Sequence, residues 1–406
     1  MGWMKERQLE QWEAGFSAPW GQSVCGSCTG DKALSSLVEV YANADECSFC
    51  GRKGQNIAAD TDTVLERIGS QLLIGWSKAE DILYHDSEEE SGYAGPVYEI
   101  RDVLENEGVE FGNEDFEAFV LEAFGETQYT PEGVYAMTQS EALRAGWDDL
   151  VETVKHRQRF FFVLARNDRS GDGAGVAVPR GRELLSELDR LIREYGLLRE
   201  LSAGTPLYRV RLHPLRKRYE TAKDLGAPPP VSASQSRMSP AGIPMLYTAE
   251  EIETAIAETV GARRSRRRGL TIATFKPTET LRIVDFSQLP PIPGVFDDSP
   301  ETPRIRHELG FLYGMRRDIG GEVKLDGRQH IEYVPTQVVC EYIRHRLPER
   351  LGEPVHGLGW GSTRASGGRN VVLFFDRDRC VETGERPRFP EGPLVALAEH
   401  RRCRLP

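Results

Sequence analysis

Arginine, tyrosine and glutamate are spaced closely in the segment RMSPAGIPMLYTAEEIETAIAE. The segment runs from Arg237 to Glu258, and Tyr247 lies 10 residues after the arginine and 11 before the glutamate. Arginine binds anionic oxygens through paired N–H donors, and a carboxylate stabilises developing positive charge. Taken singly, these are a loop arginine, a strand-end tyrosine and a surface glutamate. The segment is therefore either an ordinary strand–helix joint or half of an active site.

The elements that would position these side chains are a Ser/Pro-rich loop, a short apolar strand and a helix. Thr248 is predicted to cap the helix, with Glu251 completing a capping box. Glu258 lies off the apolar stripe of this helix. The stripe consists of residues at helical spacing, namely Ile252, Ala255, Ile256 and Val260.

Four of the seven cysteines form two C-x-x-C pairs, Cys25 with Cys28 and Cys47 with Cys50, separated by 18 residues. Two such knuckles are typical of a structural zinc site, in which four thiolates leave no position open for a catalytic water. A disulfide framework is the alternative, but the charged N-terminus MGWMKERQLEQWEAG lacks the apolar core of a secretion signal.

The composition describes a globular chain of two or three domains, with 406 residues, 39% hydrophobic and 28% charged. No run of 18 apolar residues is present, so we expect no membrane span and a cytoplasmic location. The net charge of −12 argues against general nucleic-acid binding. A local basic run, GARRSRRRG, is either a solvated loop or an anion or partner contact. It contains Arg263, Arg264, Arg266, Arg267 and Arg268.

The pattern along the chain predicts an α+β protein. Residues 60–165 are mostly helical, whereas LYRVRL, LTIATF, LRIVDF and NVVLFF are strands interleaved with helices. The sequence GDGAG lacks the Gly-Lys-Ser/Thr ending of a P-loop and is interpreted as a linker. We predict a zinc-ribbon-like module at 1–58, a helical domain at 59–165, a linker with a connecting helix at 166–204, and a catalytic domain at 205–406.

Several segments from Leu207 onward resemble those of the RES domain family. They are LYRVR, the RMSPAGIPMLYTAEE segment, ETAIAE, and GLGWGSTRASGGRNVVLFF, in which Ser362 precedes Asn370 by eight residues. RES domains are related in fold to ADP-ribosyltransferases and diphtheria-type toxins. The front half resembles the HEPN/RES N-terminal type through YHDSEEESGYAGPVY, GWDDLVETVKHRQRFFF and the C-x-x-C pairs. HEPN relatives can be ribonucleases, but the helical region shows no convincing Arg-x4–6-His motif.

The RES resemblance implies that NAD is the substrate and assigns roles to residues of this chain. Arg209 and Arg237 would bind the pyrophosphate, and Tyr247 would orient the nicotinamide or its ribose. Glu258 would stabilise the oxocarbenium charge, and Ser362 would hold the nicotinamide end. Arg211 is an alternative to Arg209, which is preferred because it directly follows Tyr208.

The resemblance implies an NAD-degrading toxin or phage-defence effector that acts by hydrolysis or phosphorolysis and is controlled by an antitoxin protein. The first alternative is a mono-ADP-ribosyltransferase that modifies a macromolecule. The second is a non-catalytic, zinc-containing protein that binds nucleic acid or a partner. A homo-oligomer is possible for each, and the sequence does not indicate the acceptor.

Overall fold

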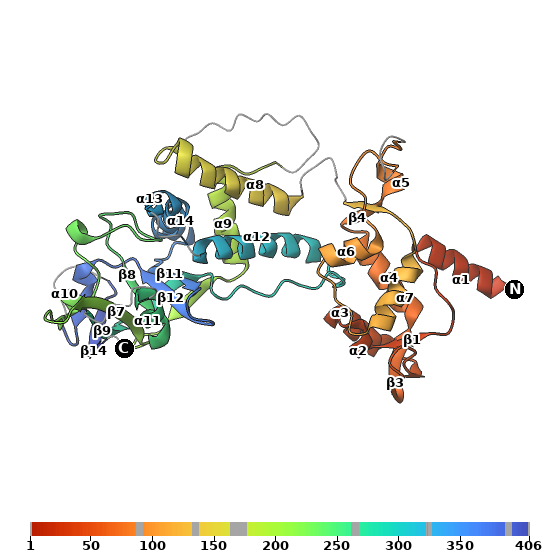
Figure 1. Cartoon of the computed structure of the whole chain (residues 1–406), viewed down its shortest axis with the longest axis horizontal. Helices are drawn as coiled ribbons and strands as arrows, with labels where there is room; N and C mark the ends of the chain where they lie inside the picture. Colours follow the sequence, from red (N-terminus) through yellow and green to blue (C-terminus); the bar gives the residue numbers. More distant parts are fainter. Residues whose placement is uncertain are drawn as a thin grey trace. The chain divides into compact units, whose positions relative to one another are not determined.

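The computed structural model describes most of the chain (Figure 1). The described residues are 2–86, 92–131, 138–162, 177–260, 268–321, 323, 327–385 and 392–404. Within these limits they form two compact units, one of residues 2–140 and 291–308, the other of residues 141–290 and 309–404. Four arginines of the basic run (Arg263, Arg264, Arg266 and Arg267) lie outside the described residues, as does GDGAG.

The first unit combines short strands with helices. Its strands are β1 (Ser23–Cys25), β2 (Ala44–Glu46), β3 (Lys53–Asp60), β4 (Trp76–Lys78) and β5 (Tyr129–Pro131). Its helices are α1 (Gly2–Glu13), α2 (Gly26–Thr29), α3 (Lys32–Tyr41), α4 (Thr61–Leu72), α5 (Ala79–Ile82), α6 (Ile100–Asn106) and α7 (Glu114–Phe124). The strands β1, β3 and β2 form an antiparallel sheet in that order, and β4 pairs with β5.

One hydrophobic core holds the first unit together. Val64 and Ile68 of α4 are fully buried and belong to the same core as Phe116 of α7. Cys25, Cys28 and Cys47 belong to the same core. The cysteine knuckles therefore pack directly on the helices that follow them. The domain boundaries given above remain predictions.

The second unit is built on a nine-stranded sheet with the order β13-β14-β9-β7-β8-β12-β11-β10-β6. Its strands are β6 (Leu198–Leu201), β7 (Leu207–Pro214), β8 (Leu246–Ala249), β9 (Arg268–Pro277), β10 (Leu281–Asp285), β11 (Gly357–Gly361), β12 (Arg369–Leu373), β13 (Cys380–Glu382) and β14 (Val395–Arg404). Neighbouring strands are antiparallel except for the pairs β10–β11 and β13–β14. The α+β class and the predicted strands are confirmed.

Helices precede and separate these strands along the chain. They are α8 (Gln139–Glu152), α9 (Arg182–Glu194), α10 (Ala222–Leu225), α11 (Ile252–Val260), α12 (Thr302–Gly320), α13 (Gln329–Glu332), α14 (Val334–His345) and α15 (Leu347–Leu351), with short turns of other helix types at Thr153–Arg157, Pro230–Ser232 and Arg377–Arg379. The division between the two units falls close to the start of α8 and within α12. None of the described helices has the length and apolar character needed to cross a bilayer.

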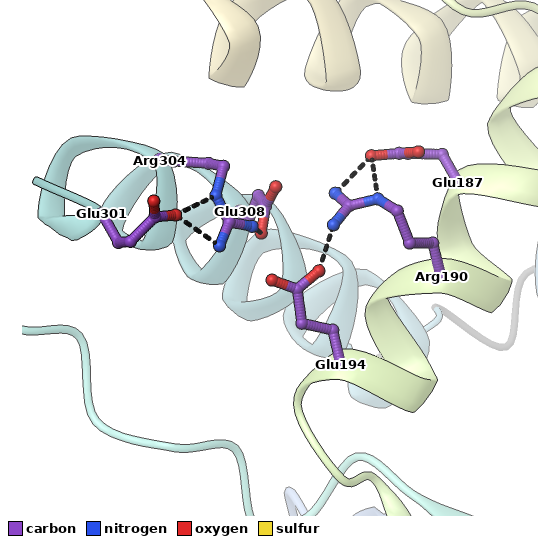
Figure 2. A network of polar contacts seen from close by, with 6 residues as sticks. All are labelled: Glu187, Arg190, Glu194, Glu301, Arg304 and Glu308. Atoms are coloured by element: carbon purple, nitrogen blue, oxygen red, sulfur yellow. Dashed lines mark hydrogen bonds and ion pairs between the residues drawn. The ribbon is translucent and has the colours of Figure 1, made fainter.

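Two of these helices carry arginines that each bridge two glutamates of their own helix (Figure 2). Arg190 of α9 pairs with Glu187 and Glu194. On α12, Arg304 pairs in the same way with Glu301 and Glu308. Pairs three and four residues apart lie on one helix face, so these contacts stabilise each helix locally.

The start of α11 differs from the sequence prediction. Thr248 lies in β8 opposite Val371 of β12, and its hydroxyl donates to the Val371 carbonyl at 2.9 Å instead of capping a helix. Strand pairing extends β8 through Ala249, so the helix begins at Ile252. The predicted stripe is confirmed, because Ala255 is buried and Ile256 packs against the cluster that covers β7.

Candidate active site

A cavity of about 440 Å³ lies in the second unit beside β7, β8, β12 and α11. Its lining includes four of the five residues predicted to act on substrate, namely Arg209, Arg237, Tyr247 and Glu258. The fifth, Ser362, is not in the described lining, although its neighbours Thr363 and Arg364 are. The fold thus gathers residues that are up to 162 positions apart in the chain (Tyr208 to Asn370) around one cavity.

The carboxylate of Glu258 is fixed at one oxygen by two donors. Ser362 Oγ donates to Glu258 Oε1 at 2.7 Å, and Asn370 Nδ2 donates to the same oxygen at 2.8 Å. The second oxygen, Oε2, lies 3.8 Å from Arg364 Nε. One third of the Glu258 side chain is exposed. The carboxylate is therefore held in one orientation while remaining accessible from the cavity.

Ser362 has its hydroxyl oxygen occupied by its own turn. The backbone N–H groups of Arg364 and Ala365 both donate to Ser362 Oγ at 3.1 Å. Because two donors approach the oxygen, its single proton is directed to Glu258. In this arrangement Ser362 orients the carboxylate, whereas the resemblance implied a contact with the nicotinamide end.

Arg209 and Arg211 project from the same strand, β7, but contact different groups. Arg209 lines the cavity and donates through Nη1 to the Tyr247 carbonyl at 2.8 Å. Its Nε is buried and makes no hydrogen bond to any described atom. Arg211 donates to the carbonyl of Gly226 at 2.7 Å. Of the two arginines left open by the sequence, Arg209 is the one that lines the cavity.

Burial lowers the pKa of Arg209, and the charge of Arg211 lowers it further. A guanidinium remains protonated at neutral pH even so. An anion beside Arg209 would relieve both effects, because it supplies an opposite charge in a poorly solvated place. The charge balance around β7 therefore favours an anionic ligand.

Arg237 lies between a helix end and an aromatic ring. It donates to the carbonyl of Ile319 at 2.8 Å and to that of Gly321, at the C-terminus of α12. Its guanidinium carbon lies 5.8 Å from the centre of the Tyr333 ring. Burial lowers the pKa of Arg237, and nearby Tyr333 and Glu258 partly offset this lowering. These contacts hold the guanidinium beside the cavity.

Tyr247 lines the cavity, and its hydroxyl is hydrogen-bonded within the segment that precedes β8. The hydroxyl lies 2.9 Å from Ser239 Oγ and accepts from the Met238 N–H at 3.2 Å. Burial raises the pKa of Tyr247 to about 12. The phenol is therefore neutral at neutral pH, and its chemistry is limited to packing and orientation.

Three lining residues had not been assigned a role from sequence. They are Arg364, Asn370 and Tyr333. Arg364 follows Ser362 by two residues, and Asn370 served in the sequence only to identify the segment that contains Ser362. Tyr333 directly precedes α14. The spacing of Ser362 and Asn370 could have indicated that both side chains contact Glu258. Tyr333 carries no comparable signal, because only the folded chain brings it to Arg237.

The four cysteines of the C-x-x-C pairs come together in the first unit, whereas the cavity residues belong to the second unit. The Sγ atoms of Cys25 and Cys28 are 3.7 Å apart, those of Cys25 and Cys50 3.7 Å, and those of Cys28 and Cys47 3.8 Å. All four sulfurs lie within 4.8 Å of one another. Tetrahedral zinc with Zn–S bonds of about 2.3 Å requires S–S distances of roughly 3.8 Å. The donor set therefore fits a structural zinc ion.

Comparison with protein families finds two matches that together cover most of the chain. Residues 41–168 match HEPN/RES N-terminal domain 1, and residues 206–396 match the RES domain. The cavity residues all lie within the second match. No curated protein and no solved structure shows significant similarity to the chain.

Proposed function

The chain carries a RES domain at residues 206–396, and on this premise we propose that the cavity binds NAD and that the site cleaves its nicotinamide–ribose bond. The observation that carries the proposal is the carboxylate of Glu258, which two donors fix at the wall of a cavity that also contains arginines. A volume of about 440 Å³ is within the range of small-molecule sites.

The arginines account for binding. Arg209 has an unpartnered buried donor, and Arg237 holds a guanidinium at the same cavity. A pyrophosphate offers oxygens that match guanidinium N–H groups two at a time. We assign the pyrophosphate to these two arginines, and the nicotinamide riboside portion to the part of the cavity between Tyr247 and Glu258.

Glu258 accounts for the chemical step. As the C1′–N bond breaks, its electron pair returns to the pyridinium nitrogen and leaves neutral nicotinamide. Positive charge then develops on the ribose, where the carboxylate stabilises it. An acceptor oxygen bonds to C1′ and releases its proton to solvent. Because nicotinamide leaves as a neutral molecule, no general acid is required.

The acceptor is water or inorganic phosphate, which yield ADP-ribose or its 1-phosphate respectively. Consumption of NAD in this way would make the chain a toxin or defence effector, held in check by a partner protein. The four-cysteine site would hold zinc as a structural element, since four thiolates exclude a catalytic water.

The test is NAD consumption by the full chain beside Glu258→Gln. We expect the wild type to release nicotinamide, and the variant to lose roughly 100- to 1,000-fold in kcat, as removal of a charge-stabilising group does elsewhere. Separation of the products with and without phosphate names the acceptor.

The matched control is Glu253→Gln, an exposed glutamate on the same helix. It should retain wild-type activity. Equal loss in both variants, or turnover that Glu258→Gln leaves unchanged, contradicts the assignment of Glu258. Label transfer from NAD to a macromolecule, without free ADP-ribose, would indicate ADP-ribosyltransferase activity instead.

A further inference from the structure

A charged network lies at the joint between β8 and α11, the helix that carries Glu258. Arg199 of β6 pairs through Nε with Asp285 Oδ2 of β10 at 2.6 Å, and also pairs with Glu250. Arg369 of β12 pairs through Nη2 with the other oxygen of Glu250 at 2.7 Å. The side chains of Glu250 and Asp285 are only 10% and 4% exposed. Arg199 thus bridges two nearly buried carboxylates, and Arg369 from a different strand pairs with one of them, Glu250.

The network is continuous with the first turn of α11. The Glu250 N–H donates to the Arg369 carbonyl at 3.0 Å. In return, the Arg369 N–H donates to Glu251 Oε2 at 2.9 Å, and Thr254 Oγ1 donates to the same oxygen at 2.9 Å. These contacts tie the beginning of the helix to the beginning of β12, both by side chains and by backbone.

Two glycines allow these groups to come so close. A Cβ atom at Gly359 of β11 would lie 2.8 Å from Asp285 Oδ1, and one at Gly368 would lie 2.2 Å from Thr254 Oγ1. Contacts below about 3 Å are essentially never made by real Cβ atoms, so any side chain at either position would displace the network. Gly368, directly before β12, therefore permits the close approach of α11.

The network also connects the two partners in the catalytic contact. Glu258 lies about two turns into α11, which begins directly after Glu250 and Glu251, and Asn370 directly follows Arg369 on β12. Asn370 Nδ2 reaches Glu258 Oε1 at 2.8 Å. A shift of α11 along β12 would separate these two atoms. Replacing buried ion pairs by apolar residues is often neutral or favourable for stability, so stability alone is a weak reason for this arrangement.

We propose that Arg199, Asp285, Glu250 and Arg369 are positioning residues that set the register of α11 against β12, and so hold Glu258 on Asn370 for catalysis. The catalytic part of this inference rests on the proposed function, whereas the positioning of α11 does not. The network lies outside the described lining of the cavity. It therefore acts on the chemical step through Glu258 and leaves the binding of NAD to other residues.

The experiment compares the full chain with Arg369→Lys and with Glu250→Gln. The lysine keeps the charge but loses the fork that reaches two acceptors, and the glutamine keeps the shape but loses the charge. Both variants are first checked for a cooperative thermal transition. Amide hydrogen exchange then reports on α11, where we expect exchange to become about tenfold faster than in the wild type.

The control is Arg282→Lys. Arg282 lies on β10, is as exposed as Arg199, and pairs with Glu200 and Glu353 instead of the network. Its replacement should leave exchange in α11 unchanged. If α11 is protected equally in wild type and in both network variants, the proposal is overturned, whether or not the chain consumes NAD.

The second arm is kinetic and isolates the catalytic role. For Arg369→Lys we expect kcat to fall roughly 10- to 100-fold, the effect of a misplaced catalytic group, with KM for NAD within about threefold. Combining Arg369→Lys with Asn370→Ala should cost less than the product of the single losses, because both act on the same contact. If the loss in the double variant equals the product of the two single losses, or if only KM rises, the network has no role in positioning Glu258 for catalysis. A wild type without NAD turnover instead refutes the proposed function and leaves hydrogen exchange to decide the positioning.

Discussion

At the scale of single residues, Glu258 depends on two donors that stand at opposite ends of one turn. Ser362 lies just after β11 and Asn370 lies on β12. Loss of a hydrogen bond to a charged group costs about 1.5–3 kcal/mol. For Ser362→Ala we therefore expect kcat for NAD to fall roughly 10- to 100-fold with little change in KM, measured by steady-state kinetics.

Ser202→Ala, at an exposed serine, is the control and should behave as wild type. A raised KM with unchanged kcat in Ser362→Ala would instead support direct contact of this serine with NAD, the role implied by the resemblance.

The buried phenol of Tyr247 should make the free energy of unfolding depend on pH in the alkaline range. Its pKa is about 12 in the folded chain and about 10 when unfolded, since burial favours the neutral phenol. Its contribution to folding is complete below pH 10 and is lost as the pH rises through 12. Between pH 9 and 11 the wild type should lose about 1 kcal/mol more than Tyr247→Phe, as measured by urea unfolding. Tyr84→Phe, at a tyrosine that is 80% exposed, should show no such difference from wild type.

At the scale of elements, the turn between β11 and β12 sets how closely α11 approaches. Gly368→Ala would place a methyl group 2.2 Å from Thr254 Oγ1. We expect a loss of about 1–3 kcal/mol in the free energy of unfolding, with reduced NAD turnover, because α11 must move away. Denaturant unfolding and kinetics measure the two effects.

Gly361→Ala is the matched variant at the other end of the same turn, where an added Cβ meets no atom within 4 Å. It should retain stability and turnover. If Gly368→Ala and Gly361→Ala have equal stability and equal turnover, the close packing of α11 on this turn contributes to neither property.

At the scale of the whole molecule, the cysteine cluster predicts that a metal ion stabilises the first unit. Cys25, Cys28 and Cys47 lie in its hydrophobic core, so without an ion the packing of protonated thiols would hold the two knuckles together less firmly than metal bonds do. Elemental analysis should find one zinc per chain. Cys28→Ser should lose it and melt about 10 °C or more below wild type.

Cys403→Ser, outside the cluster, controls for general loss of a thiol. Purified chain without zinc, or a Cys28→Ser variant as stable as wild type, would show that the knuckles need no metal. Retained NAD turnover after zinc removal would separate the cluster from the proposed chemistry.

The reach of sequence reasoning differs between local and distant features. The periodicity of apolar residues distinguishes strands from helices, so both could be predicted. The two C-x-x-C pairs and the Arg–Tyr–Glu segment are short-range patterns, so they could also be recognised in the sequence. The start of α11 could not, because pairing with β12 extends β8 past Thr248. The network of Arg199, Glu250, Asp285 and Arg369 leaves no pattern at all in the sequence, since each residue comes from a different element and looks like an ordinary surface charge.

The position of Arg237 has a consequence for occupancy of the cavity. Two of its N–H groups already donate to carbonyls at the C-terminal end of α12, that of Ile319 within the helix and that of Gly321 just after it. An anion that recruits these groups competes with the helix terminus for them, so occupancy and fraying of the last turn of α12 are linked reciprocally. A spectroscopic probe on that turn should therefore report whether an anionic ligand, such as the proposed NAD, occupies the cavity.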